Sequence, residues 1–504
     1  MAKRTTTPAL MLNPREPGTP AHRWLCTALR AEILEGRLRP GARLPATRDL
    51  AGQYGLSRGT IVSAFEQLKA EGYLEGTVGS GTYVNKILPD ELLQVPLKAR
   101  APRAAPRPRR RALSDFGERA RPVPPYTFSA PRAFRANQPA LDLFPTALWA
   151  QVAGRRLRRA SANLLLGCDP LGYRPLQEAV AEYLRTSRGV KCTPEQIAIV
   201  SGVQEALDLT ARLLLNPGDR VCMEDPGYVG AAATFEACGA RITPVRVDAE
   251  GMVLPPAKPG GARLAYVTPS HQFPLGISMS LPRRLALLEW ARQAGAMIFE
   301  DDYDGEFRYS GRPVPALQGL DRQGLVLYSG SFSKVLFPSI RLGYLVVPPD
   351  LVDAFAAVKS VTSRHAGVPD QAVLCEFIAE GHFGRHVRRM REIYAERLAV
   401  LQEGARRRLG GLLEISGIDA GLQTAGWLVG TIDGETAARA AAGRGVEVTA
   451  LSVYSRGPVA REGLHLGFAA VDPREIRRGV EELAVALETE REEPLSRSVD
   501  LQAR

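Results

Sequence analysis

The sequence predicts two folded domains of different class: a small N-terminal domain of helices with a short β element, and a large α/β domain with a largely parallel sheet. A chain of 504 residues is too long for one hydrophobic core. A stretch rich in Pro, Ala and Arg, KARAPRAAPRPRRRA, separates two regions of ordinary globular composition. Beyond it, strand-like apolar runs alternate with helical stretches, as expected for parallel strands joined by helices.

The expected domain boundaries follow these changes in composition. We predict the small N-terminal domain over residues 16–86, a Pro/Arg-rich linker over 87–126, the α/β domain over 127–490 and a frayed polar tail over 491–504. The linker has almost nothing apolar to bury, so it should be extended and flexible. The main predicted strands of the large domain are QIAIVSG, RLAYVTP, AMIFEDD, LVLYSGS and LGYLVV.

The net charge of +11 is concentrated at the N-terminal end. Residues 1–88 contain 12 Lys/Arg and 7 Asp/Glu, and residues 89–126 contain 9 and 4, so each segment carries +5. The remaining three quarters of the chain are close to neutral. A positive field confined to one end predicts a polyanionic partner for that end.

Composition also excludes several classes of protein. The start, MAKRTTTPAL, lacks the apolar run of a signal peptide, and no stretch approaches the roughly 18 to 20 apolar residues of a membrane helix. The six cysteines are scattered without a CxxC pair, which is typical of reduced thiols and not of a zinc site. We therefore expect a cytoplasmic protein with no metal and no membrane segment.

Residues 43–84 predict two short helices. Thr47 can cap a helix that ends near residue 53, and Ser57 is a good N-cap for the next helix. This second helix places its apolar residues on one buried face, namely Ile61, Phe65 and Leu68. Its first turn, with Arg58 and Thr60, is the end that a recognition helix pushes into the major groove of DNA.

After these helices the sequence predicts a wing, with strands at residues 73–74 and 82–84 around a glycine-rich tip. The elements LPATRDLA, LSRGT, EGYL and GSGT together resemble the DNA-binding domain of the GntR superfamily of bacterial regulators. The resemblance implies a winged helix-turn-helix that contacts DNA through Arg43, Arg48, Arg58, Thr60, Gly79 and Ser80. Whether an arginine clamps a guanine or holds a phosphate stays open.

The stretch YSGSFSKVLFPSIRLGY, residues 328–344, carries the chemistry of the large domain. Lys334 lies among small and hydroxyl residues, with Arg341 seven positions later. An aldehyde cofactor needs an amine to form a Schiff base and a cation to hold its phosphate. Lys334 and Arg341 supply these groups, and Ser331 and Ser333 can add hydroxyls to the phosphate oxygens. The spacing resembles that of fold-type I pyridoxal-phosphate proteins.

Other parts of that fold follow in the expected order. By resemblance, Asp301 at the end of AMIFEDD faces the pyridinium nitrogen, and Tyr303 on the same side donates to the phenolic oxygen. Asp302 should face the opposite side of a regular strand. Tyr228 is expected to stack on the pyridine ring. Further expected cofactor contacts are His271 and Gln272 in TPSHQFPLG, and the backbone of Gly202, Val203 and Gln204 at a helix N-terminus.

The combination of both domains resembles the MocR-type regulators over nearly the whole chain, as in DPLGYRPLQEAVAEYLRTSRGV and PEQIAIVSGVQEALDLTARLLLNPGD. The resemblance implies a head-to-tail, domain-swapped homodimer that binds a double-stranded DNA operator, and a dimer suits a paired operator site. It also implies pyridoxal 5'-phosphate as cofactor and a small-molecule effector.

Three positions depart from this pattern. An aminotransferase holds its substrate carboxylate best with the fork of an arginine, but His465 in LHLGFAAV stands at the usual arginine position, with Arg456 and Arg461 as candidate replacements. Gly230 stands where the GABA-responsive member of the group has an arginine, and Gly167 where an aromatic residue is expected near the phosphate. These departures argue against efficient transamination and against a GABA-like effector.

The sequence therefore predicts a regulator that senses pyridoxal phosphate, or an amino compound that reacts with it, through different operator affinities of its occupied and empty forms. Genes of vitamin B6 or amino-compound metabolism are candidate targets. Two alternatives stay open. One is a working aminotransferase that carries a DNA-binding domain, with Lys334 as its base. The other is a DNA-binding protein whose core only dimerises, against which the intact Lys334, Asp301 and Arg341 argue.

Overall fold

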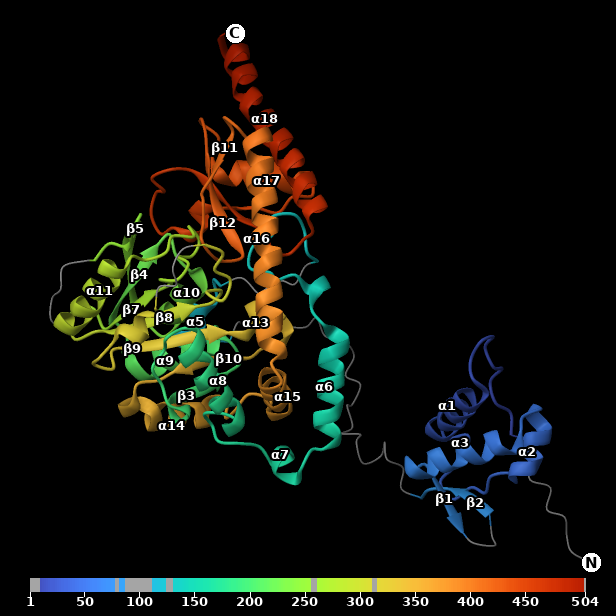
Figure 1. The fold of residues 1–504 in the computed structure, drawn as a ribbon. Coiled ribbons are helices and arrows are strands. Elements are labelled where there is room, and N and C mark those ends of the chain that lie inside the picture. The colour runs from blue at the N-terminus through green and yellow to red at the C-terminus, as the bar shows by residue number, and fades with distance from the viewer. Residues whose placement is uncertain are drawn as a thin grey trace, which may run out of the picture. The chain divides into compact units, whose positions relative to one another are not determined.

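The computed structural model describes residues 10–77, 81–86, 111–123, 130–254, 261–310 and 315–502. The chain divides into two compact units, residues 1–111 and 112–504 (Figure 1). Each unit has its own hydrophobic core. Within these described ranges, no helix is both long enough and apolar enough to cross a lipid bilayer.

The N-terminal unit combines three helices with a two-stranded antiparallel ribbon. Its elements are α1 (Ala21–Leu34), α2 (Thr47–Tyr54), α3 (Arg58–Ala70), β1 (Leu74–Thr77) and β2 (Gly81–Val84). The predicted apolar face of α3 is buried in the core of the unit together with Leu25 and Leu29 of α1. The predicted helix-turn-helix and wing are therefore both present.

The two predicted helix caps have different outcomes. Ser57 caps α3, since its hydroxyl oxygen accepts a hydrogen bond from the backbone N–H of Thr60 at 3.1 Å. The expectation for Thr47 is wrong, because Thr47 is the first residue of α2 and Ala46 takes the cap position without a side-chain hydrogen bond. A threonine next to a helix start is equally compatible with the cap and with the first helical position.

The second unit is built on an eight-stranded sheet with the order β3-β10-β9-β8-β7-β4-β5-β6. Its strands are β3 (Ile197–Val200), β4 (Arg220–Asp225), β5 (Arg241–Asp248), β6 (Gly251–Met252), β7 (Leu264–Val267), β8 (Met297–Asp302), β9 (Val326–Ser331) and β10 (Gly343–Val346). The run from β9 to β5 is parallel, whereas β10 and β6 pair antiparallel with their neighbours. The five strands predicted from apolar runs are all present.

Helices cover both faces of this sheet. Both faces of its strands are therefore buried, which explains why the strands are continuous apolar runs in the sequence. Leu264 and Phe299 pack on one face against α9, α10 and α14, while Ala265 and Ile298 pack on the other against α11. The helices of this layer are α8 (Arg174–Ser187), α9 (Val203–Leu214), α10 (Val229–Ala237), α11 (Leu281–Ala294), α12 (Leu317–Leu320), α13 (Phe332–Val335) and α14 (Val352–Thr362).

A smaller antiparallel sheet follows in the chain, with the order β11-β12-β14-β13. Its strands are β11 (Leu413–Ile415), β12 (Gln423–Leu428), β13 (Thr449–Ala450) and β14 (Gly463–Gly467). The long helix α16 runs from beside the large sheet to β11, so it connects the two subdomains (Figure 1). The other helices are α6 (Thr146–Arg158), α7 (Ala162–Leu166), α15 (Val368–Ala379), α16 (His382–Arg408), α17 (Gly434–Gly443) and α18 (Pro473–Gln502).

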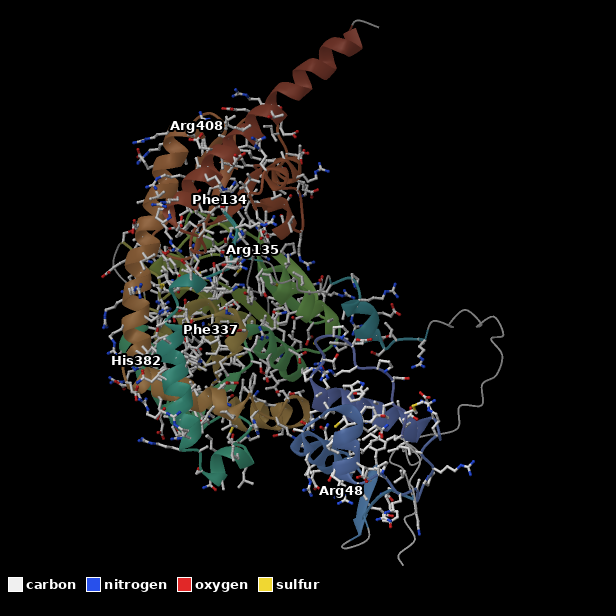
Figure 2. The ribbon with its side chains drawn as sticks, turned by 90° about the vertical axis from the view of Figure 1, so that its right-hand side faces the viewer. Arg48, Phe134, Arg135, Phe337, His382 and Arg408 are labelled. Carbon is white, nitrogen blue, oxygen red and sulfur yellow. The ribbon has the colours of Figure 1, made fainter. Side chains whose placement is uncertain are left out.

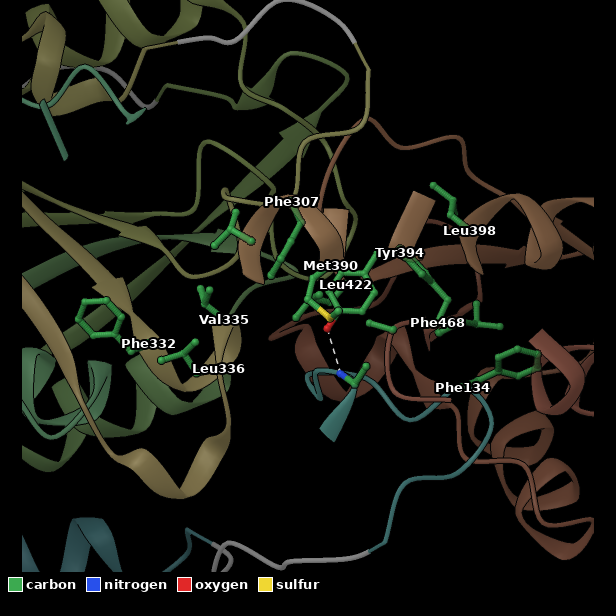
Figure 3. Packing of buried hydrophobic residues seen from close by; sticks show 14 of the residues in the cluster. Phe134, Phe307, Phe332, Val335, Leu336, Met390, Tyr394, Leu398, Leu422 and Phe468 are labelled. Atoms are coloured by element: carbon green, nitrogen blue, oxygen red, sulfur yellow. Dashed lines mark hydrogen bonds between the residues drawn. The ribbon is translucent and has the colours of Figure 1, made fainter. Parts of the chain in front are cut away.

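The core where these subdomains meet is centred on α16. Figure 3 shows Met390 and Tyr394 of this helix among apolar side chains from both subdomains. The ring of Phe307 packs edge-on to Tyr394 at 4.9 Å between centroids, and the Tyr394 hydroxyl accepts a hydrogen bond from the backbone N–H of Ala140 at 3.0 Å. This contact fixes the segment that leads into the site described below.

Two segments differ from the sequence-based expectation. Residues 115–120 of the expected extended linker form α5 (Asp115–Ala120), which Ser114 caps and which packs on α10. The docking of this helix supplies the stabilisation that linker composition alone does not predict. Residues 87–110 and 124–126 of the linker lie outside the described residues. The C-terminal residues expected to fray continue α18 as far as Gln502.

Candidate functional site

Lys334 lies where β9 ends and the short turn of α13 begins. This is the carboxyl edge of the parallel strands, where ligands of open α/β sheets bind. Its Nζ donates a hydrogen bond to the backbone oxygen of Asn137 at 2.9 Å. Burial lowers the pKa of Lys334 to about 8, although the carboxylates of Asp304 and Asp301 oppose the shift. The side chain therefore supplies more neutral, nucleophilic amine near neutral pH than an exposed lysine does.

Asp301 lies near the end of β8, the parallel neighbour of β9. One carboxyl oxygen accepts a hydrogen bond from the Tyr266 hydroxyl at 2.7 Å, and the other is buried with no hydrogen-bond partner among the described residues. Burial raises the pKa of Asp301 to about 7. A buried oxygen left without a donor fits a protonated ring nitrogen. Asp302 faces the other way, as expected, and accepts from Nε of Arg188 at 2.9 Å.

Some of the groups expected to hold a phosphate lie together at the N-terminus of α9. Gly202 precedes the helix with a φ of 112°, and Val203 is the first helical residue. The guanidinium of Arg341 lies beside them, since a Cβ on Gly202 would be 3.5 Å from its Nη1. Ser331 ends β9, and the hydroxyl of Ser333 is buried without a partner among the described residues. Helix N–H groups, a guanidinium and a hydroxyl together form a suitable donor set for a phosphate.

Tyr228 is the N-cap residue of α10 and lies over Gly230. Its hydroxyl donates to Oε1 of Gln204 at 3.4 Å, so the side chain of Gln204 joins the starts of α9 and α10. A Cβ on Gly230 would lie 2.5 Å from the Tyr228 ring. A larger residue at this position would therefore displace the ring, which gives the glycine a steric role beside the expected stacking tyrosine.

His271 and Gln272 have different surroundings. Nδ1 of His271 lies 2.9 Å from a carboxyl oxygen of Asp304 and 3.0 Å from the hydroxyl of Tyr303, so this histidine and tyrosine lie side by side. Nε2 of Gln272 donates to backbone oxygens of its own loop and of Pro226, at 2.7 and 2.9 Å. These bonds give Gln272 a role in holding the loop, and its contact with a cofactor stays a prediction.

Three residues near Lys334 were not anticipated from the sequence, namely Asn137, Asp304 and Gln423. The backbone N–H of Asn137 donates to Oε1 of Gln423 at 2.8 Å, and Nε2 of Gln423 donates to the Tyr303 hydroxyl at 3.4 Å. Lys334 is thereby connected to β12 of the small sheet. Asn137 has a φ of 66°, which asparagine tolerates better than most residues.

His465 lies on β14 and is completely buried. Its Nδ1 is 3.1 Å from the hydroxyl oxygen of Tyr454, and its Nε2 has no hydrogen-bond partner among the described residues. Burial lowers the pKa of His465 to about 3, and the neighbouring His271 adds to the shift. The ring is therefore neutral at physiological pH and cannot replace the charge of an arginine.

The two arginines considered as replacements are both held by carboxylates. Arg456 donates from its two terminal nitrogens to the two carboxyl oxygens of Glu236, at 2.8 and 2.7 Å. It lines a cavity of about 240 Å³ together with Glu224, Tyr228, Glu236, Tyr454 and Ser455, among others. Arg461 pairs with Glu414 at 2.6 Å and does not line this cavity.

The residues expected to contact DNA lie at the surface of the N-terminal unit. The Arg48 side chain on α2 is 84 % exposed and extends from the unit (Figure 2). Arg58 is exposed in the first turn of α3, next to the half-buried Thr60, and the exposed Arg43 lies beside β2 of the wing. Two expected wing contacts, Gly79 and Ser80, lie outside the described residues.

Comparison with known families matches each unit separately. Residues 25–84 match the bacterial regulatory proteins of the gntR family, and residues 133–483 match aminotransferase class I and II. The chain is 41 % identical to the probable rhizopine catabolism regulatory protein MocR of Rhizobium meliloti, over 96 % of this chain and 98 % of that protein. It is 33 % identical to the pyridoxine biosynthesis transcriptional regulator PdxR of Corynebacterium glutamicum, over 95 % and 98 %.

Comparison with solved structures indicates which cofactor the large unit binds. Kynurenine aminotransferase of Pyrococcus horikoshii, in a complex with PMP, aligns with a TM-score of 0.67 and 28 % identity, over 72 % of this chain and 92 % of that chain. The donors around Lys334, Asp301 and Arg341 fit the amine, ring nitrogen and phosphate contacts that such a cofactor needs. The large unit thus carries a binding site for pyridoxal 5'-phosphate.

Proposed function

Because the chain belongs to the GntR-type transcription regulators that carry an aminotransferase class I/II domain, the group of MocR, we propose that occupancy of its pyridoxal-phosphate site controls its affinity for operator DNA. The signal is pyridoxal phosphate, or an amino compound that reacts with it. Genes of vitamin B6 or amino-compound metabolism are the proposed targets. The names of PdxR, a pyridoxine biosynthesis regulator, and of MocR, a rhizopine catabolism regulator, support this choice.

The observation that carries the proposal is the environment of Lys334. Its side chain is half-buried, its pKa is lowered to about 8, and its amine feels the charges of Asp301, Asp304 and Arg341. A core used only for dimerisation gains nothing from a partly desolvated amine near a carboxyl oxygen without a partner, because both groups cost stability. The arrangement is reasonable only if a ligand completes it.

Each of these groups has a separate task when the cofactor binds. Pyridoxal phosphate supplies an aldehyde carbon that primary amines attack. Lys334 would hold that carbon through Nζ, and Asp301 would accept a hydrogen bond from the ring nitrogen. The N–H groups that follow Gly202 and the guanidinium of Arg341 would hold the phosphate.

Two paths of contacts lead away from the site. Lys334 reaches the small sheet through Asn137, and loss of a proton from Nζ on cofactor binding would weaken that bond. Tyr228 begins α10, and the other end of this helix accepts a hydrogen bond from Nε of Arg119, at the Ala237 oxygen, at 3.0 Å. Arg119 lies on α5, the first described helix of the large unit. A shift of α10 would therefore reach the segment that leads toward the DNA-binding unit.

We further propose that the protein acts in the cytoplasm as a head-to-tail, domain-swapped homodimer on double-stranded DNA. Apolar side chains at the surface support a subunit interface: Leu165 and Leu166 of α7 are 71 % and 84 % exposed, and Val361 of α14 is 84 % exposed. Leu166 and Ser360 line one cavity, so these two elements are neighbours. A dimer would present two recognition helices to paired half-sites.

The test is an absorbance spectrum of the purified, dialysed protein with pyridoxal phosphate, beside a Lys334→Ala variant. We expect the band of the lysine-bound cofactor in the parent and its loss in the variant. Lys191→Ala removes an exposed lysine of the same unit and should keep the band. Absence of the band from the parent protein would contradict the proposal.

A further inference from the structure

We propose that Glu205 is a positioning residue for the cofactor phosphate: its carboxylate fixes the loop before α9, and the buried ammonium of Lys359 holds that carboxylate in place. The inference rests on the proposed function, since it concerns the pyridoxal-phosphate site of the same unit. It adds to that site two residues, one from α9 and one from α14, which the sequence did not single out.

The loop that Glu205 holds is short and contains a glycine. β3 ends at Val200, and α9 begins at Val203. Only Ser201 and Gly202 connect them, and Gly202 has a φ of 112°, one of many conformations open to a glycine. The backbone N–H of Ser201 donates a hydrogen bond to Oε2 of Glu205, in the first turn of the helix. The carboxylate therefore fastens the start of the loop to the helix that follows it.

This bond leaves the neighbouring N–H groups for the phosphate. The N–H groups of Glu205 and Ala206 donate to the backbone oxygen of Gly202, at 3.1 and 3.4 Å. The first N–H groups of a helix have no acceptor within it, and here those of Val203 and Gln204 come before the bonded ones. They are the groups expected to hold a phosphate at the N-terminus of α9. A loop fixed at both of its ends keeps them directed at one point.

Lys359 holds the carboxylate from the side of α14. Its side chain is completely buried, and its Nζ donates to Oε1 of Glu205 and, at 3.3 Å, to the hydroxyl oxygen of Ser363. The Ser363 hydroxyl in turn donates to the same carboxyl oxygen. Burial by itself raises the pKa of Glu205, but the hydrogen bonds from Lys359 and Ser363 outweigh it and lower the pKa below its usual value. One oxygen is thus held by α14, and the other is presented to the loop.

A purely structural tie between α9 and α14 does not need this pair. Burying an ammonium and a carboxylate is costly, and apolar side chains of similar volume join two helices at least as well. An apolar pair, however, offers no acceptor to a backbone N–H. A carboxylate without the ammonium would repel a phosphate bound nearby. Glu205 and Lys359 together supply the acceptor without adding net charge, and neither has another ion-pair partner among the described residues.

The experiment compares two probes, pyridoxal 5'-phosphate and pyridoxal, which share the ring and the aldehyde and differ in the phosphate. Each is titrated into dialysed, full-length protein while the cofactor absorbance band is followed, and urea unfolding is measured in parallel. One double variant, Glu205→Leu with Lys359→Met, removes both charges and the acceptor. A second, Glu205→Gln with Lys359→Met, removes both charges but keeps a side-chain oxygen for the loop. Neither leaves a buried ion unpaired.

The parent should bind pyridoxal 5'-phosphate more tightly than pyridoxal. The variant with leucine should lower the ratio of the two affinities by about tenfold, the effect of one misdirected hydrogen bond to a charged group, with little change for pyridoxal. The variant with glutamine should keep the ratio of the parent. Asp208→Asn removes a carboxylate of the same helix that pairs at the surface with Arg212 at 2.8 Å, and it should change neither affinity.

A further variant covers failure of the leucine protein to fold. Glu205→Asp keeps the charge beside Lys359 but shortens the reach of the acceptor, so it should lower the ratio in the same direction. If urea unfolding shows no folded leucine variant, this substitution decides the question, and a ratio equal to that of the parent would then overturn the inference.

The outcomes separate this inference from the function it rests on. Equal ratios in the leucine and glutamine variants, or an equal loss of both probes in the leucine variant, would overturn the positioning role. A parent protein that shows the band but binds both probes equally would also overturn it, and would leave the proposed function in place. A parent protein without the band would remove the proposed function and this inference together.

Discussion

Nζ of Lys334 and the backbone oxygen of Asn137 are joined by a hydrogen bond of 2.9 Å. The amine that we propose to hold the cofactor therefore also contacts a segment that packs against the small sheet. Asn137 in turn donates to Gln423 on β12. A change at Nζ consequently affects a contact between the two subdomains, which is the kind of coupling that a ligand-controlled regulator requires.

The lowered pKa of Lys334 predicts a pH dependence for cofactor capture. Since burial lowers this pKa from 10.5 to about 8, the capture rate of the cofactor-free protein should rise with pH and level off above about pH 8. Stopped-flow absorbance across pH 6 to 10.5 measures it. Between about pH 8 and 10.5 the unfolded chain binds more protons than the folded one, so the Lys334 contribution to the free energy of unfolding rises over that range. A capture rate that still climbs steeply at pH 10 would contradict this account.

Asp301 is expected to favour ligand binding at the expense of stability. Burial raises its pKa from 3.8 to about 7, so its contribution to the free energy of unfolding is present below pH 3.8 and is lost as the pH rises through about 7. Cofactor-free Asp301→Asn should thus be more stable than the parent at pH 8, by about 1–3 kcal/mol, yet bind the cofactor more weakly. Urea unfolding and a cofactor titration measure the two effects.

The neighbouring residue provides the matched control for that substitution. Asp302→Asn keeps the same change of charge but removes a partner of Arg188, so it should destabilise the protein. If Asp301→Asn left the cofactor affinity unchanged, Asp301 would not be the partner of the ring nitrogen.

The exposed arginines of the N-terminal unit should determine DNA affinity. Arg48→Ala and Arg58→Ala should each weaken binding, and each lost phosphate contact should reduce the slope of log affinity against log salt by about 1. Fluorescence anisotropy with an operator selected from random DNA measures both quantities. Arg406→Ala, which removes an exposed arginine from α16 of the other unit, should change neither. Parent-like binding by both variants would exclude these two positions from the DNA contact.

The contact between α5 and α10 should transmit the state of the site. Arg119→Ala removes the bond to the Ala237 oxygen, so it should keep the cofactor band but reduce the ratio of operator affinities with and without cofactor. Arg121→Ala, at the C-cap of the same helix, breaks a surface pair with Glu118 and should leave this ratio unchanged. Equal ratios in the two variants would show that the coupling takes another route.

The sequence predicted those features that depend on local patterns. Short apolar runs located five of the eight strands of the large sheet, and Ser57 located the start of α3, because strand burial and helix capping depend on residues that are close together in the sequence. Family resemblance brought Lys334, Asp301 and Arg341 into one site, and the fold class is confirmed by the matches to both domains.

The remaining features of the fold and the site depend on tertiary contacts. Helix α5 forms in a linker-like sequence because it docks on α10, and Asn137 reaches Lys334 from 197 positions away in the chain. The side chain of Gln272 donates a hydrogen bond within its own loop. The glutamates that pair with Arg456 and Arg461 are far from these arginines in the sequence. Pairings of this kind leave no local signal, since they arise only when distant segments pack together.

The central claim is that the cofactor at Lys334 controls DNA binding. The most direct measurement is the operator affinity of the full-length protein, with and without pyridoxal phosphate, in the parent and in Lys334→Ala. The account predicts that the cofactor changes the affinity of the parent at least about fivefold, the lower end of typical allosteric coupling, and leaves the variant unchanged. Equal affinities of the parent with and without cofactor, or an equal response in Lys334→Ala, would contradict it.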